Sequence, residues 1–147
     1  MSITIDQYRK MFGADRPKAR KYHNNPQWEC QGCHLTFTTK PDPKDRCPCG
    51  RRDYHYFPSQ AEHHRWIELR REQETGAIKN LQRQTRWTLI VNGIQVSSYR
   101  ADFTYERAGI LIVEDVKGGK ATRTEAYTMR KKLMKALHGI AITEVEG

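Results

Sequence analysis

Hydrophobic residues occur in short segments along this chain, with four aliphatic residues in succession at 110–113. Such a run is typical of a strand that is buried on both faces of a sheet. It continues without a break into Glu114-Asp115-Val116-Lys117. Since side chains alternate along a strand, Asp115 and Lys117 should share one face and Glu114 should lie on the other. Charges at the end of a core strand are costly. They indicate either a metal-binding carboxylate beside a reactive lysine, or a solvated strand end with a local ion pair.

Two other segments have the spacing of helices. Ser59 and Glu62 match a capping box, which predicts a helix from this point to about residue 75. Glu62 either closes this cap only, or looks inward toward a sheet at the head of a stripe formed by Trp66, Leu69 and Gln73. A second helix is predicted between Thr124 and Gly139, with a buried face made of Met129, Leu133, Ala136, Leu137 and Ile140.

The remaining apolar segments predict strands. A strand over 85–91, the hairpin signal Asn92-Gly93 and a return strand over 94–103 precede the strand that starts at residue 110. The three would form a meander, and a last strand is predicted over 140–145. In an antiparallel pair, the end of one strand lies beside the start of its neighbour. Asp102 and Asp115, each near the end of its predicted strand, would therefore be separated unless the second strand bends or bulges.

All four cysteines lie in one short segment, as the pairs Cys30/Cys33 and Cys47/Cys49. Two close pairs about a dozen residues apart can bind one zinc ion in a tetrahedral thiolate site, as in a zinc ribbon or knuckle. The second pair has one intervening residue instead of two, which makes His34 a substitute ligand. Disulfides are the alternative, and the lack of a secretion signal disfavours them. The zinc would either only stabilise a segment too small to fold alone or also help to contact DNA.

Composition narrows the class of partner. The chain has 147 residues and a net charge of +9, and its mean hydropathy is −0.88. The length predicts one compact domain with a small appendage. The basic excess favours a polyanion, and nucleic acid over a membrane, because no lipid anchor and no basic amphipathic terminal helix is apparent. No apolar run is long enough to span a bilayer. Residues 1–26 are read as a basic arm that lies on phosphates, or as a plain disordered terminus, and the protein is expected to be cytoplasmic.

The ordered set of elements and acids resembles the core of the PD-(D/E)XK nucleases. In that superfamily a central mixed sheet is flanked by helices, so the resemblance implies an α/β (α+β) fold with the order αβββαβ. Glu62 stands at the acid of the first helix, Ala101-Asp102 at the proline–aspartate motif, and Asp115-Val116-Lys117 at the acid-x-lysine motif. Alanine replaces the motif's proline, while the aspartate that carries the ligand is kept.

Further segments are similar to a family of small phage and prophage nucleases of this superfamily, which resemble Holliday junction resolvases. They include Phe57-x-Ser59-x-x-Glu62, Gln84-x-Arg86, Ala101-Asp102-Phe103 and Thr124-x-x-Tyr127. The likeness covers most of residues 54–147, and the cysteine segment looks like an insertion. The predicted parts are therefore a basic arm over 1–26, a zinc-ribbon-like module over 27–53 and a nuclease domain over 54–147.

The resemblance implies a DNA endonuclease that depends on Mg²⁺ or Mn²⁺. Asp102, Asp115 and Glu62, with the carbonyl of Val116, would hold the metal, and Lys117 would act on the attacking water or the transition state. Basic side chains expected to contact DNA are Arg51, Arg52, Arg83, Arg86, Arg100, Arg130, Lys131 and Lys135.

The same resemblance implies structure-selective cleavage of branched or four-way junction DNA in phage recombination, replication or packaging. Cutting two strands would require two sites and hence a homodimer. A phage-encoded protein of this kind would act in the cytoplasm of the bacterial host. Two alternatives stay open: a zinc-ribbon DNA-binding protein with an inactive nuclease-like domain, and a nuclease directed at RNA.

Overall fold

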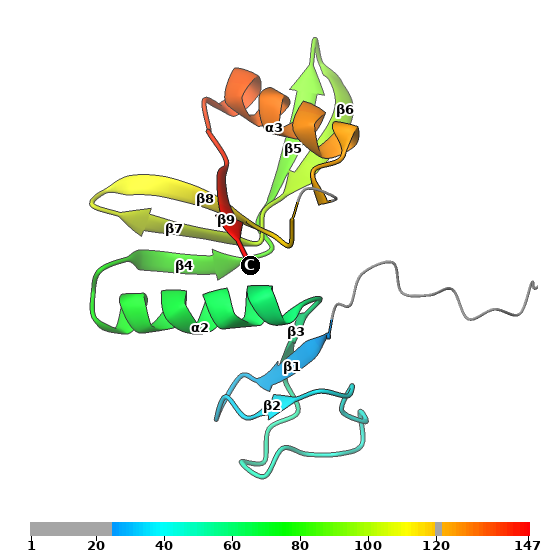
Figure 1. Cartoon of the computed structure of the whole chain (residues 1–147), viewed down its shortest axis with the longest axis vertical. Coiled ribbons are helices and arrows are strands. Elements are labelled where there is room, and N and C mark those ends of the chain that lie inside the picture. The colour runs from blue at the N-terminus through cyan, green and yellow to red at the C-terminus, as the bar shows by residue number, and fades with distance from the viewer. Residues whose placement is uncertain (1–24, 120–121) are drawn as a thin grey trace, which may run out of the picture.

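The computed structural model describes residues 25–119 and 122–147, which fold into a mixed α+β arrangement of helices and sheets (Figure 1). The predicted basic arm over 1–26 lies outside these residues, apart from its last two. No helix in the described part of the chain has the length and apolar content needed to cross a bilayer.

The cysteine segment forms a small antiparallel sheet. Its strands are β1 (Gln27–Cys30), β2 (Thr36–Phe37) and β3 (Tyr54–Phe57), in the order β2-β1-β3. Aromatic rings pack across the sheet, with the ring centroids of Trp28 and Tyr56 5.2 Å apart. Because β3 pairs with β1 along its whole length, this sheet continues past the boundary predicted at residue 53.

The central sheet is mixed and has the strand order β4-β7-β8-β9. All its pairs are antiparallel except β8–β9, and α3 lies between these two parallel strands in the sequence. A separate two-stranded sheet is formed by β5 and β6. The bounds are β4 (Lys79–Arg83), β5 (Arg86–Val91), β6 (Ile94–Arg100), β7 (Phe103–Arg107), β8 (Ile110–Lys117) and β9 (Thr143–Glu146).

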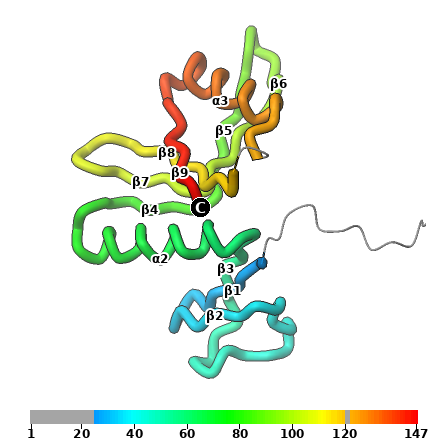
Figure 2. The backbone as a smooth tube through the Cα atoms, viewed as in Figure 1, coloured from blue at the N-terminus to red at the C-terminus, as the bar shows by residue number. Residues whose placement is uncertain are grey.

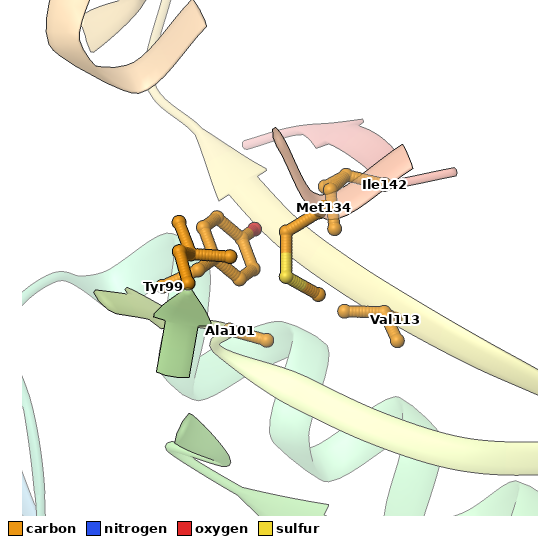
Figure 3. Close-up of a cluster of buried hydrophobic side chains, with 6 residues drawn as sticks. Tyr99, Ala101, Val113, Met134 and Ile142 are labelled. Carbon is orange, nitrogen blue, oxygen red and sulfur yellow. The ribbon is translucent and has the colours of Figure 1, made fainter. Parts of the chain in front are cut away.

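The two helices lie on opposite sides of the central sheet (Figures 1 and 2). Helix α2 (Gln60–Glu74) covers one face and joins it to the small sheet. Helix α3 (Glu125–His138) lies on the other side together with the β5–β6 hairpin. Each side has its own buried cluster, and Figure 3 shows the one under α3, formed by Leu89, Tyr99, Ala101, Val113, Met134 and Ile142. The cluster under α2 contains Leu69, Ile78, Phe103 and Tyr105.

The prediction of a three-stranded meander is wrong, because its first two strands do not belong to the central sheet. The hairpin turn at Asn92-Gly93 is confirmed by positive φ angles of 50° and 79°, but both strands of this hairpin lie outside the central sheet. The return strand ends at Arg100, and the chain enters the central sheet only at Phe103. The place of the first core strand is taken by β4, which was not predicted. As an edge strand it carries polar side chains, and its register is irregular where Asn80 has a φ of 54°.

The ends of α3 follow the prediction, and its buried face does so in part, since Leu133 and Ile140 pack against the core cluster. Thr124 caps the start, and Gly139 ends the helix in the left-handed region with a φ of 68°. Met129 and Leu137, which were expected in the core, are 60% and 39% exposed, and the fully buried residue is Met134. The helix is turned this way because it packs on the hairpin, where His138 contacts the carbonyl of Thr88.

Burial along β8 follows the prediction only in part, because Val113 is buried but the first two aliphatic residues are not. Ile110 and Leu111 are 64% and 51% exposed, because they stand at the turn that joins β7 to β8. The charged end is buried, since it lies between β7 and β9 with Glu114 paired to both strands. The predicted alternation is confirmed: Asp115 contacts Lys117, whereas Glu114 contacts Arg65 of α2.

Glu114 is a structural carboxylate, and its loss is expected to destabilise the fold. Arg65 donates from Nε and Nη2 at 2.7 and 3.0 Å, and the hydroxyl of Tyr105 donates at 2.7 Å. Glu114→Ala would remove the buried partner of this partly buried guanidinium and leave it only the more exposed Glu68 and Glu72. Breaking a buried pair in this way typically costs about 3–5 kcal/mol. Urea unfolding should detect this loss. The substitution of Glu68, an exposed partner of the same arginine, should change the unfolding free energy by less than about 1 kcal/mol.

Candidate functional site

A pocket of about 410 Å³ opens where the end of β8, the start of β7, the first turn of α2 and helix α3 meet. Glu62, Asp102, Asp115 and Lys117 all line this pocket, so the fold brings together the four residues that the sequence selected. Val116 lines it as well.

The position of Asp102 removes the difficulty raised by the predicted meander. Phe103 pairs with Glu114, so Asp102, one residue earlier, lies beside the end of β8. Its Oδ2 accepts a hydrogen bond of 2.9 Å from the backbone N–H of Val116. Asp102 therefore precedes the core strand β7 and does not end a strand. The antiparallel pairing of β7 with β8 places it next to Asp115. The change of sheet between Arg100 and Phe103 produces the break that was expected as a bulge.

Lys117 is held by two neighbours within the pocket. Its Nζ lies 2.9 Å from Oδ2 of Asp115 and 3.6 Å from the ring centroid of Tyr127 on α3. Both Asp115 and Lys117 are more than nine-tenths buried, so this pair is not a solvated strand end. A cation over a ring face is attracted electrostatically, and α3 thereby helps to fix the ammonium group.

Glu62 faces the other carboxylates. Oγ of Ser59 accepts from the Glu62 N–H at 3.2 Å, which confirms the predicted cap. Burial and the charge of Asp102 raise the pKa of Glu62 to about 7, against an opposing effect of Arg83. Burial and the charge of Asp115 likewise raise the pKa of Asp102 to about 6. These shifts show that the three acids repel one another across the pocket.

The acids are less tightly gathered than the cysteines. In the described ranges 25–119 and 122–147, the one group of three or more metal-binding side chains with all ligand atoms within 4.8 Å is that of the four cysteines. Asp102 and Asp115 instead use oxygens to accept from Val116 and Lys117. Carboxylate oxygens are the donors that Mg²⁺ prefers, so the chemistry of the set fits this ion, but one ion shared by all three requires the oxygens to approach.

The raised pKa values predict a specific pH dependence of stability in the absence of divalent metal. Glu62, with a folded pKa of about 7 against 4.5, binds its proton more tightly in the folded state. Its contribution is thus complete below pH 4.5 and is lost as the pH rises through 7, by at most about 3 kcal/mol. Urea unfolding at pH 5 and pH 8 should show this loss, and Glu62→Gln should reduce it. Glu74→Gln, an exposed change at the other end of α2, should leave it unaltered.

The predicted DNA-contacting residues fall into four groups. Arg86, Arg100 and Arg130 line the pocket, and Arg130 also donates to Ser97. Arg51, Arg52 and Lys135 are exposed away from it, whereas Lys131 is paired with Glu144 at 2.8 Å. Arg83 has a packing role instead, because its guanidinium lies 3.9 Å from the Phe57 ring centroid and donates to the Tyr56 carbonyl.

Two pocket tyrosines, Tyr99 and Tyr127, were not selected as site residues from the sequence. Tyr127 entered only as part of a similar segment. Tyr99 is the one fully buried residue of β6, and an aromatic residue within a strand is typical of packing. Its closeness to Ala101-Asp102 in the sequence was the one available signal.

The four cysteine sulfurs form a second candidate site, a metal centre in the small sheet. Sγ of Cys30 lies 3.5 Å from that of Cys49, Sγ of Cys33 lies 3.4 Å from that of Cys47, and all four thiols are free. The short spacing of the second pair therefore still closes the group, and His34 is not needed as a ligand. The backbone N–H of Cys33 lowers the pKa of the Cys30 thiol to about 6, which favours the thiolate that binds metal.

A buried carboxylate joins this four-cysteine site to α2. Glu29, which precedes Cys30 and is 1% exposed, accepts from Trp66 and Arg70 at 3.2 and 2.9 Å. It also contacts His63 and His34, at 2.8 and 3.0 Å. His34, the predicted substitute ligand, is thus engaged with Glu29. Since His63 directly follows Glu62, the metal centre and the acidic pocket are connected through one helix.

Comparisons with known proteins give one match. A family model described as a protein of unknown function (DUF1064) matches residues 51–143. This range contains every acidic residue of the pocket and leaves all four cysteines outside. No curated protein and no solved structure matches the chain.

Proposed function

The chain belongs to the DUF1064 family of proteins of unknown function, and we propose that it is a metal-dependent DNA endonuclease of the PD-(D/E)XK type. The observation that carries the proposal is the convergence of Glu62, Asp102, Asp115 and Lys117 on one pocket. The core order also supports it. With the β5–β6 hairpin set aside, a helix is followed by three antiparallel strands, a helix and a parallel strand.

Asp102, Asp115 and Glu62 would hold Mg²⁺ or Mn²⁺, with the Val116 carbonyl as a further oxygen. Such an ion, when bound, lowers the pKa of a water and offsets charge on a phosphate. Asp102 and Asp115 are oriented by the backbone of β8 and by Lys117 respectively. Once the oxygens approach around the ion, these carboxylates would help to orient the scissile phosphate for in-line attack.

Lys117 would act on charge and protons around the reacting phosphate. Its ammonium is a donor that can stabilise negative charge developing on phosphate oxygens. Burial and the neighbouring acids raise the pKa of Glu62 to about 7 when no cation is bound, and a divalent ion held by Glu62 would favour its charged form. Arg86, Arg100 and Arg130 surround the same pocket and would neutralise the phosphates beside the cut.

The basic side chains at the pocket contact backbone phosphates, which carry no base sequence. We therefore propose structure-selective cleavage of branched or junction DNA, by a homodimer that presents two pockets to two strands. Zinc in the four-cysteine site would hold the small sheet together, and through Glu29 it would support the helix that carries Glu62.

The test is cleavage of linear, nicked, flap and four-way junction DNA, with a matching RNA duplex as comparison. The protein should cut DNA with Mg²⁺ or Mn²⁺ and remain inactive when Ca²⁺ replaces them. A chelator is unsuitable as the control, because it would also remove metal from the cysteines. Binding without cleavage of any of these substrates would favour the zinc-ribbon DNA-binding protein with an inactive pocket. Preferential cutting of RNA would favour the RNA-directed nuclease.

A further inference from the structure

The β5–β6 hairpin ends in a tip that no other part of the described chain covers. Each residue over 90–96 is exposed, whereas Leu89 and Tyr99, nearer the root, are buried in the cluster under α3. Figure 1 shows the turn of the hairpin projecting past this helix. Since side chains alternate along a strand, both faces of the tip are open to solvent.

The tip is aliphatic on both of its strands. Side chains with exposed fractions between 36% and 68% gather there: Ile90, Val91, Ile94 and Val96. They flank the Asn92-Gly93 turn, and Val91 pairs directly with Ile94. Apolar side chains on a projecting hairpin add nothing to the core and favour aggregation, so polar residues would serve the fold equally well. A cluster in this position indicates a surface that is covered when a partner binds.

The charge of the hairpin favours a nucleic acid as this partner. No acidic residue occurs between Glu74 and Asp102, so the hairpin carries positive charge alone. Arg86 and Arg100 stand directly opposite each other at its root and line the acidic pocket. Like charges at opposed positions destabilise a strand pair, and a bound anion would offset this effect. The hairpin is thus basic where it meets the pocket and aliphatic where it ends.

The size of the aliphatic tip disfavours a second copy of the chain as the partner. Each side of a stable protein interface buries about 800 Å², which four partly exposed aliphatic side chains cannot supply by themselves. A branch point in DNA offers a surface of the right size and chemistry, because the last base pair before the branch has an apolar face without a stacking neighbour. Isoleucine and similar side chains pack against such faces in proteins that kink DNA.

The length of the hairpin determines where its tip would meet the DNA. Val91, just before the turn, is five positions after Arg86 at the pocket. At the usual rise of a strand, this segment spans roughly 17 Å. That length equals about five base-pair steps of 3.4 Å. With a phosphate in the acidic pocket, the tip can therefore reach a branch point about five nucleotides away.

We propose that the tip of the β5–β6 hairpin is a wedge, which packs its aliphatic side chains against the outermost base pair at a branch point of the DNA bound in the acidic pocket. The proposal rests on the nuclease function and deepens it, because it assigns the preference for branched DNA to named side chains. Arginines bind any duplex through its phosphates, whereas a free base-pair face occurs only where the duplex opens. The wedge thus supplies the selectivity for DNA structure that phosphate contacts cannot supply.

The double variant Ile94→Ser/Val96→Ser tests the wedge, and Ile110→Ser/Leu111→Ser is its matched control. The control residues are 64% and 51% exposed and directly follow the two-residue turn between β7 and β8. Both variants replace two exposed aliphatic side chains beside a hairpin turn. Each should therefore fold with a thermal unfolding midpoint close to that of the wild type.

The fluorescent base 2-aminopurine, placed next to the branch point of a four-way junction, reports the unstacking of this base. With Ca²⁺ in place of Mg²⁺, saturating wild-type protein should raise its emission by about two-fold or more, and the tip variant should leave it close to that of free DNA. Junction affinity of the tip variant, measured by fluorescence anisotropy, should fall roughly ten-fold. Its affinity for a linear duplex of equal length should stay within about two-fold of the wild type, because the arginines are intact. The control variant should match the wild type in all three measurements.

The proposal is overturned if the tip variant keeps the emission and the junction affinity of the wild type, and the nuclease function then stays intact. No rise in emission with the wild type, or an equal loss in the control variant, would also overturn it. Sedimentation velocity without DNA detects the other occupant. If the tip variant turns a wild-type dimer into a monomer and loses junction and duplex affinity alike, the tip is a contact between copies and the wedge is excluded. If the wild type cuts no DNA with Mg²⁺ or Mn²⁺, the nuclease function fails, and the emission in Ca²⁺ decides alone whether the tip opens the branch point.

Discussion

Asp115→Asn is expected to reduce the rate of DNA cleavage by about 10³-fold or more, which corresponds to about 4 kcal/mol in the barrier. The carboxylate is 4% exposed and stands between the proposed metal position and Lys117. Asparagine keeps the shape but removes the charge that would hold a divalent ion. The initial rate on the best substrate in Mg²⁺ measures the effect, and Lys117→Met should cause a comparable loss.

A matched exposed change separates this effect from general damage. Asp53→Asn alters an exposed aspartate of the small sheet region and should leave cleavage unchanged. DNA affinity in Ca²⁺ should stay within a few-fold of the wild type in all three variants, because the arginines at the pocket are intact. Substantial cleavage by Asp115→Asn at wild-type stability would exclude the acidic pocket as the catalytic site.

Cys47→Ser is expected to abolish binding of one zinc ion per chain and to unfold the small sheet. The thiol is 2% exposed and lies 3.4 Å from the sulfur of Cys33. Zinc binding to four thiolates contributes on the order of 10 kcal/mol or more to the folding of such segments. We expect the three cysteines that remain to be insufficient to keep this segment folded. Loss of β1 would also release Glu29 from Trp66 and Arg70 on α2.

Elemental analysis and near-UV circular dichroism would measure this result, since Trp28 and Tyr56 pack across the small sheet. Leu35→Ser, a change at a half-exposed position of the same segment, should retain the zinc and the spectrum. A Cys47→Ser protein that keeps one zinc and an unchanged spectrum would contradict the assignment of the four-cysteine site.

Local signals in the sequence predicted the ends of the elements well. Ser59, Thr124, Gly139 and Asn92-Gly93 stand where the structure has caps and a turn, because each acts through its own backbone or side chain. The spacing of the two cysteine pairs likewise predicted that the four sulfurs lie close together. Where one residue type determines the geometry, the sequence is sufficient.

Features that depend on tertiary partners were predicted less well. The edge strand β4 has one aliphatic residue, Leu81, and becomes a strand by pairing with β7. The face of α3 depends on the hairpin beneath it, which the sequence pattern placed in the central sheet. The burial of Glu114 and the exposure of Ile110 depend on how far neighbouring strands extend along β8.

The acidic site depends both on local sequence signals and on tertiary partners. Its four charged members line one pocket, although the strand assignment around Asp102 was wrong. The alternation that puts Asp115 and Lys117 on one face is a property of any strand, whereas the contact of Asp102 with Val116 depends on the pairing of β7 with β8. Tyr99 could not be selected, because its place at the pocket depends on how the β5–β6 hairpin packs.

The attachment of the β5–β6 hairpin leaves its distal turn able to vary, while its inner residues pack under α3 and line the pocket. Its two ends meet at a closed root, where the N–H of Gln84 donates to the Asp102 carbonyl at 3.0 Å and the N–H of Ala101 donates to Thr85 at 2.9 Å. Arg83 and Phe103, on either side of the root, are paired neighbours in the central sheet. Lengthening or exchanging the distal turn would therefore leave the scaffold undisturbed. Related chains could acquire a different reach along a nucleic acid while keeping the same acidic centre.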